Sequence, residues 1–238
     1  MRVLFYLLFA ATAFGQALTF DAASVKPNHL EDHIVSIDVG PGGRFVARGY
    51  TLKLLIQQAY EIKGFQILGG ASWLDVDRFD ISARGRANAT RHQVNQMLQS
   101  LLAERFGLKL HAVQSEMPGF ALEVAVAKPK LTPSQSSEED QAARHEETGA
   151  LAGIGFSMPS FAKMVGAYIS KPVVDNTGMK GLYDFRIHWT ERADQVSEQS
   201  DGISLISALR DQLGLKLVSK HVMADLVQID AASRPTAD

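Results

Sequence analysis

The chain has 238 residues, of which 46% are hydrophobic and 21% are charged, with a formal net charge of −2 and no cysteine. This composition excludes a disordered or collagen-like protein, and the lack of a basic excess argues against a nucleic-acid-binding protein. The absence of cysteine excludes disulfides, a thiolate nucleophile and Cys-ligated zinc or iron–sulfur sites.

Residues 1–17 have the pattern of a secretory signal peptide. Arg2 is followed by the apolar run Val3–Phe14, and small residues then offer cleavage after Gly15 or Ala17. The apolar run is shorter than the roughly 18 residues that a membrane-spanning helix needs. We therefore expect an exported protein, periplasmic or extracellular, with no stable membrane insertion after cleavage.

Residues 18–127 are predicted to form a first module that begins with a β-rich lead-in. The spacing of apolar residues predicts a helix over 52–60, with Thr51 as N-cap and Gly64 just past its end. A second helix is predicted to follow the capping-box pair Thr90 and Gln93 and to end at Gly107.

The segments between these helices alternate like strands with one buried face. Leu108–Leu110 and Phe120–Val126 are predicted to pair as a hairpin that turns at Met117–Gly119. The expected order of elements is therefore βαββαββ.

Residues 128–150 are rich in Ser, Glu, Gln and Pro, which is typical of a polar linker or an exposed loop. Residues 151–232 are predicted to form a second module with the same order of elements, including a helix capped by Ser160. Residues 233–238 are predicted to be a loose tail.

Similar residues recur in the two modules at a nearly constant offset. Phe106–Leu110 and Leu213–Leu217 both carry a Gly-Leu-Lys-Leu sequence, and their glycines are Gly107 and Gly214. Such an ordered series indicates an internal duplication. We predict an α+β fold of two tandem pseudo-repeats of a βαββαββ module with small mixed or antiparallel sheets.

No sequence motif assigns a catalytic, cofactor-binding or metal-binding residue. His29 and His33 have a spacing that allows zinc binding on a helix, but the segment follows Pro27 and precedes strand-like residues, so a polar loop is the favoured interpretation. Asp175–Gly178 reads Asp-Asn-Thr-Gly, which is typical of a turn.

Three residues are candidates for binding a ligand or partner. Trp73 and Asp75 lie in a well-defined loop sequence, and Trp189 lies beside a predicted strand. A tryptophan in such a place can stack on a ligand, although it can equally cover the core.

Several segments together resemble an uncharacterised family of exported proteins that is expanded in soil bacteria, especially acidobacteria. The segments that carry the resemblance are Phe20–Pro27, Gly43–Tyr60, Gly69–Ile81, Leu98–His111, Val173–Phe185 and Gln212–Leu217. Each half is also weakly similar to the short N-terminal domain of secretins and TonB-dependent receptors, small periplasmic modules that mediate contacts. The resemblance implies no activity and no catalytic residue.

We expect a non-enzymatic periplasmic protein that binds a protein, a peptide or a glycan of the cell envelope and needs no cofactor. One alternative is a hydrolase or metal-dependent enzyme of the envelope or exterior that uses some of the seven histidines. A further alternative is a sensory domain, because one region is similar to the extracytoplasmic part of antibiotic-sensing membrane proteases of the BlaR type.

Overall fold

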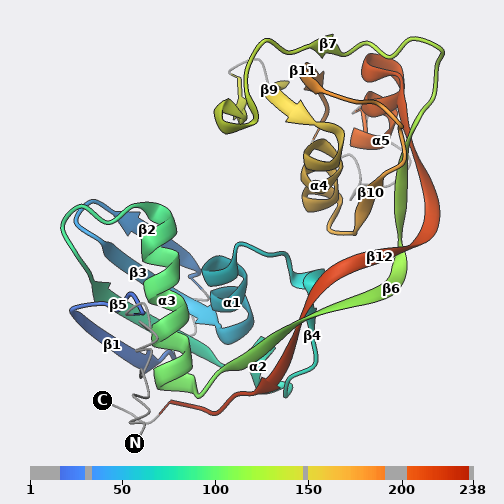
Figure 1. Ribbon diagram of the computed structural model, residues 1–238. Helices are drawn as coiled ribbons and strands as arrows, with labels where there is room; N and C mark the ends of the chain where they lie inside the picture. The colour runs from blue at the N-terminus through green and yellow to red at the C-terminus, as the bar shows by residue number, and fades with distance from the viewer. Residues whose placement is uncertain (1–16, 30–33, 147–149, 191–202, 236–238) are drawn as a thin grey trace, which may run out of the picture. The chain divides into compact units, whose positions relative to one another are not determined.

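The computed structural model describes residues 17–29, 34–146, 150–190 and 203–235 (Figure 1). Almost all of the predicted signal peptide therefore lies outside the described residues, as does His33 of the histidine pair. The fold is a mixture of helices and small sheets, which confirms the predicted α+β class.

The described residues divide into two compact units, and each is built from separate stretches of chain. The first unit contains residues up to 62, residues 69–111 and residues from 229 on, while the second contains 63–68 and 112–228. Two long strands, β6 (Lys109–Val124) and β12 (Leu215–Ala231), contribute residues to both units.

Sheet A of the first unit has the strand order β1-β5-β3-β2, with antiparallel neighbours throughout. Alternate residues of its two central strands are buried, as a sheet with one buried face requires. Its strands are β1 (Ala22–Pro27), β2 (Ser36–Gly40), β3 (Arg44–Thr51) and β5 (Arg78–Arg84).

Helices α1 (Leu52–Tyr60) and α3 (Arg91–Phe106) pack together on the inner face of sheet A (Figure 1), and the short α2 (Trp73–Val76) precedes β5. The apolar residues that predicted α1 and α3 are buried, as expected from their helical spacing. They are Leu52, Leu55, Ile56, Ala59, Val94, Met97, Leu98, Leu101 and Leu102.

Sheet C of the second unit has the strand order β7-β11-β9-β8, again with antiparallel neighbours. Its strands are β7 (Thr132–Pro133), β8 (Ala142–His145), β9 (Ala150–Ser157) and β11 (Leu182–His188), with the 3-10 turn η2 (Glu138–Asp140) before β8. The segment interpreted as a linker therefore contains strands that pair with this sheet.

The helices of the second unit are α4 (Met158–Ile169), the short α5 (Leu205–Ala208) and the π-helical turn η3 (Leu209–Leu213). They pack with sheet C in one apolar cluster that includes Phe161, Phe185 and Leu209.

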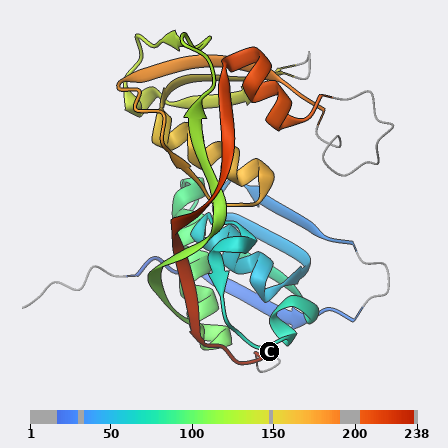
Figure 2. The ribbon, with the colours of Figure 1, turned by 90° about the vertical axis from the view of Figure 1, so that its right-hand side faces the viewer.

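Sheet B has the order β10-β6-β12-β4, and β6 and β12 run side by side (Figures 1 and 2). The 3-10 turn η1 (Gly64–Gln66) leads into β4 (Ile67–Leu68), which follows α1 and pairs in parallel with β12. The strand that follows α4, β10 (Val173–Asp175), pairs in parallel with β6. Each short strand thus pairs with the long strand from the opposite half of the sequence.

The predicted hairpin around Met117–Gly119 is wrong, because β6 continues without a turn from Lys109 to Val124. Pro118 is tolerated because N–H groups two residues apart on a strand point to the same side. The Phe120 N–H donates to Pro172 O, and β10 begins to pair only at Phe120, so Pro118 faces a side where β6 has no pairing strand.

The helix-capping predictions are confirmed at three positions and wrong at two. Thr51 caps α1, Thr90 and Gln93 form the capping box of α3, and Gly107 ends α3 in the left-handed conformation. By contrast, α1 already ends at Glu61, in the left-handed conformation, rather than at Gly64. The N-cap of α4 is Ser157, whose hydroxyl accepts from the Ser160 N–H.

The strands that lead into α1 and α4, β3 and β9, contain the same bulge. Gly49 and Gly155 have positive φ angles of 61° and 71°, and their N–H groups donate to Asp80 (2.8 Å) and Asp184 (3.0 Å) on the neighbouring strand. Pairing shifts register at both glycines. A carboxylate therefore satisfies an N–H group that the bulge removes from the ladder.

Candidate functional site

Trp73 lies at the start of α2, and a residue of the C-terminal tail covers it. The Arg234 guanidinium lies 5.1 Å from the centre of the Trp73 ring, and its Nε donates to Asp77 Oδ2 at 2.6 Å. The Ser233 N–H donates to Phe106 O at 2.7 Å. The first residues of the predicted loose tail are therefore held against the first unit.

The other two predicted ligand-binding residues also have partners within the protein. Asp75 forms an ion pair with Lys53 at 3.0 Å. Trp189 is 7% exposed and packs edge-on against Tyr168, whose hydroxyl is 3.0 Å from His145 Nε2. Trp73 and Asp75 belong to the first unit and Trp189 to the second, so the structure gathers two of the three within one unit. Their role in ligand binding stays a prediction.

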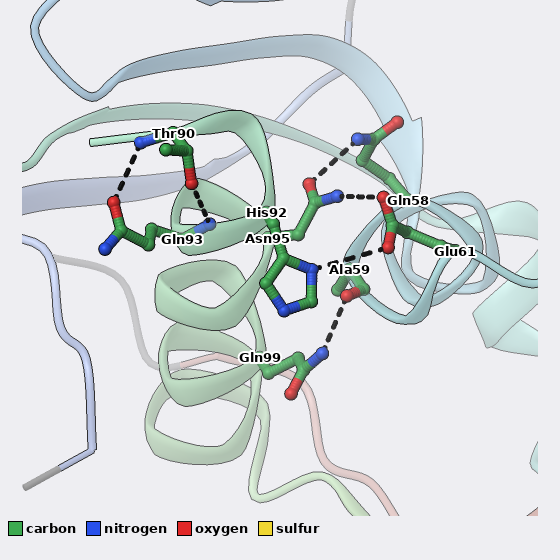
Figure 3. Close-up of polar contacts among 8 residues, drawn as sticks. All are labelled: Gln58, Ala59, Glu61, Thr90, His92, Gln93, Asn95 and Gln99. Atoms are coloured by element: carbon green, nitrogen blue, oxygen red, sulfur yellow. Dashed lines mark hydrogen bonds and ion pairs between the residues drawn. The ribbon is translucent and has the colours of Figure 1, made fainter. Parts of the chain in front are cut away.

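A polar network joins α1 to α3 in the first unit (Figure 3). Asn95 is 1% exposed, and its amide accepts from Gln58 Nε2 (3.0 Å) and donates to Glu61 Oε1 (3.1 Å). His92 Nδ1 lies 3.6 Å from Glu61 Oε2, and Gln99 Nε2 donates to Ala59 O at 2.8 Å. This network fixes one helix against the other, because a buried amide requires partners.

Two tyrosines of the first unit are partly buried. Burial raises the pKa of the phenols of Tyr50 and Tyr60, because a desolvated phenolate is disfavoured. In the second unit, a hydrogen bond from the Ser137 hydroxyl lowers the pKa of Asp140, which is fully exposed.

The outer face of sheet A, opposite α1 and α3, carries two adjoining depressions. Their volumes are about 500 and 350 Å³, and both are lined by Ser24, Arg44 and Ser82. We call this face the sheet A groove and define it by the residues Ser24, Lys26, Arg44, Val46, Arg48, Asp80, Ser82 and Arg84.

The strand register explains why these side chains lie together. Ser24 is opposite Ser82, Lys26 is opposite Asp80, and Arg44 is opposite Arg84. Alternate residues of a strand share a face. The inner face holds the buried residues Phe45, Ala47, Ile81 and Ala83, so the residues between them point outward. Two small serines and several long basic side chains therefore line the same face of the sheet.

The charge of the groove is positive. Arg44 pairs with Asp38 at 3.2 Å, and Asp80 accepts from Asn28 Nδ2 and the Gly49 N–H at 2.8 Å each. Within the described part of the chain, Lys26, Arg48 and Arg84 have no ion-pair partner. The groove therefore offers fixed positive charge and hydroxyl groups to a ligand.

The groove and the polar network are not apparent from the sequence. The alternation of Arg44, Val46 and Arg48 with buried residues signals a basic outer face on one strand. The alignment of these residues with Ser82 and Arg84 depends on strand register, which sequence alone does not supply.

The Asp175–Gly178 motif forms a turn in the structure. Asp175 Oδ1 accepts from the Thr177 N–H (2.8 Å) and hydroxyl (2.7 Å), which confirms the predicted turn. No group of three or more His, Asp or Glu side chains able to hold a metal ion occurs among the described residues. In the same residues, no helix is long and apolar enough to cross a membrane.

A comparison with known protein families finds a match for most of this chain. The model of a family described as "Protein of unknown function (DUF3738)" matches residues 53–232, which is well over half of the chain. Of the groove residues, Asp80, Ser82 and Arg84 lie inside the matched segment. No curated protein and no solved structure shows significant similarity.

Proposed function

The chain belongs to the DUF3738 family of proteins of unknown function, and we propose that it is an exported protein that binds an anionic ligand in the sheet A groove without transforming it. The observation that carries this proposal is the set of cations around the groove, of which Lys26, Arg48 and Arg84 have no ion-pair partner within the described residues. Export is inferred from the signal-peptide pattern of residues 1–17.

The chemistry of the groove favours binding over catalysis. Arginine does not lose its proton in proteins, so Arg44, Arg48 and Arg84 provide charge but no general base. The Asp80 carboxylate already accepts two hydrogen bonds from the protein. The remaining polar groups, the hydroxyls of Ser24 and Ser82, suit hydrogen bonding to a ligand.

Binding is tested with dextran sulfate, a generic polyanion, by fluorescence anisotropy of the labelled polymer. The double variant Lys26→Gln/Arg84→Gln is expected to lose about tenfold or more in affinity, because it removes two charge-assisted contacts. Arg144→Gln is the matched control, since Arg144 is an exposed arginine of a strand in sheet C. Equal binding by the double variant and the control would contradict the proposed site.

Export is tested by expressing the full chain in a bacterium and measuring the intact mass of the protein in the periplasmic and culture fractions. We expect a mature chain that begins at Gln16 or Leu18, after cleavage at Gly15 or Ala17. A full-length chain retained in the cytoplasm would contradict export without affecting the binding site.

A further inference from the structure

The cations of the sheet A groove lie at its two ends, with neutral residues between them. Arg44 and Arg84 are opposite one another at one end, while Lys26 lies at the other end beside Asp80. Ser24 and Ser82 occupy the position between the two ends. The ends are four residues apart along β5, which corresponds to roughly 13 Å at the rise of a strand.

Arg44 and Arg84 place like charges opposite one another on neighbouring strands. Like charges directly opposite one another on neighbouring strands destabilise a sheet. Asp38 compensates Arg44 at 3.2 Å, whereas Arg84 has no ion-pair partner among the described residues. An anion held between the two guanidinium groups would remove this repulsion.

From this arrangement we infer that the ligand is a polyuronate, an extended acidic polysaccharide with carboxylates at intervals along its chain. The inference rests on the proposed function, because it names the ligand of the same groove. The guanidinium groups of Arg44 and Arg84 match a carboxylate with parallel hydrogen bonds, and Lys26 meets a second carboxylate further along the polymer. The hydroxyls of Ser24 and Ser82 donate to and accept from the sugar hydroxyls between them.

Two other polyanions fit the groove less well. Single-stranded nucleic acid binds on aromatic side chains that stack with its bases, and none of the residues that define the groove is aromatic. An anionic membrane surface is bound by cations together with large apolar side chains that insert into it. Val46 is the one aliphatic side chain among the residues that define the groove.

The first experiment measures binding of fluorescently labelled oligogalacturonate to the full mature chain. We expect saturable binding that weakens with salt, and about a tenfold loss of affinity in Arg84→Gln but not in Arg144→Gln. Methyl-esterified oligogalacturonate, which lacks the charges, is expected not to bind. Preference for single-stranded DNA or for vesicles of phosphatidylglycerol over oligogalacturonate would overturn the inference.

The second experiment separates this inference from the proposed function. In Arg84→Lys, which keeps the charge but loses the planar fork, oligogalacturonate affinity is expected to fall several-fold while dextran sulfate affinity is retained. Binding of dextran sulfate but not oligogalacturonate would overturn the polyuronate and leave the proposed function standing. Shortening of the oligomers during incubation would overturn the non-catalytic role and leave the ligand class standing.

Discussion

At the scale of single residues, Asn95 and Thr51 are the polar side chains that the described core encloses. The Thr51 hydroxyl accepts from the Leu54 N–H at the start of α1, and Asn95 joins α1 to α3. Both therefore stabilise the helices that cover the inner face of sheet A. Neither contacts the groove, which is on the other face, so their substitution tests the fold alone.

Asn95→Ala is expected to lower the free energy of unfolding by about 2 kcal/mol. The substitution removes two hydrogen bonds from a buried position, and each is worth about 1 kcal/mol. Urea denaturation measures the change, and Gln96→Ala on the same helix is the control, expected within about 0.5 kcal/mol of the wild type. Equal stability of Asn95→Ala and Gln96→Ala would show that the network does not hold the two helices together.

Gly49→Ala is expected to destabilise the first unit by about 2 kcal/mol or more. A left-handed backbone costs a non-glycine residue roughly 1–2 kcal/mol, and the added methyl group would also meet Ile34 O. Gly40→Ala is the matched control, because its nearest neighbour would be Arg44 Cβ at 3.8 Å. Thermal denaturation of both variants checks the difference, and a harmless Gly49→Ala would exclude the bulge at this position.

The raised phenol pKa values of Tyr50 and Tyr60 predict a loss of stability at alkaline pH. The phenols of the unfolded chain lose their protons near pH 10, whereas those of the folded chain keep their protons to higher pH. The stability that is present below pH 10 is therefore lost as the pH rises above that value. Tyr50→Phe/Tyr60→Phe is expected to flatten this fall in urea titrations from pH 9 to pH 11. The comparison at pH 7 is the control, and an unchanged alkaline slope would contradict the prediction.

At the scale of elements, local capping sequences predicted the start of α1 and both ends of α3. Thr90 and Gln93 are three residues apart and exchange hydrogen bonds of 2.9 and 3.2 Å across the first turn of α3. The hairpin prediction failed because the partners of β6 are distant in sequence: β10 and β12. Pro118 and Gly119 are typical of a turn, and the sequence around them does not show the distant strands that pair with β6.

Thr90→Ala is expected to cost about 1 kcal/mol, because it removes the acceptor for the Gln93 N–H at the start of α3. Thr90→Ser keeps a hydroxyl in the same position and is expected to retain most of the stability. Chemical denaturation followed by circular dichroism compares the two variants. A loss of the same size in Thr90→Ser would point to the missing methyl group instead of the cap.

The two halves of the sequence share further features at the scale of elements. Thr51 and Ser157 each cap a helix that follows a glycine bulge, and Gly107 and Gly214 are left-handed at the ends of α3 and η3. The pairing of β4 with β12 and of β10 with β6 is crosswise between the halves. The two capping residues and the two glycines recur at the nearly constant offset that separates similar residues of the two modules in the sequence. The internal duplication stays a prediction.

At the scale of the whole molecule, the sequence predicted the α+β class and most core positions because periodicity is a local property. The groove was missed because it combines β1, β3 and β5, and their mutual register arises only in the folded sheet. The same reason applies to Trp73. The sequence places it in a loop that can face a ligand, whereas Arg234, 161 residues later, covers its ring.

The C-terminal tail covers the Trp73 ring through Arg234. Arg234→Gln removes the contact with the Trp73 ring and the bond to Asp77, and it is expected to cost about 0.5–1.5 kcal/mol, a modest amount because Arg234 is largely exposed. In a Trp189→Phe background, all tryptophan fluorescence comes from Trp73. The Arg234→Gln variant is expected to show stronger quenching of this fluorescence by acrylamide. Truncation after Ala232 is expected to increase quenching further, because it also removes the Ser233 bonds to Phe106 O.

Arg144→Gln in the same background is the control for the loss of one positive charge, and its quenching is expected to equal that of the parent. If Arg234→Gln also left quenching unchanged, the tail would not cover Trp73 in solution. The indole would then be open to a ligand, as predicted from the sequence. The quenching experiment therefore decides between an internal partner and an external one for this residue, independently of the sheet A groove.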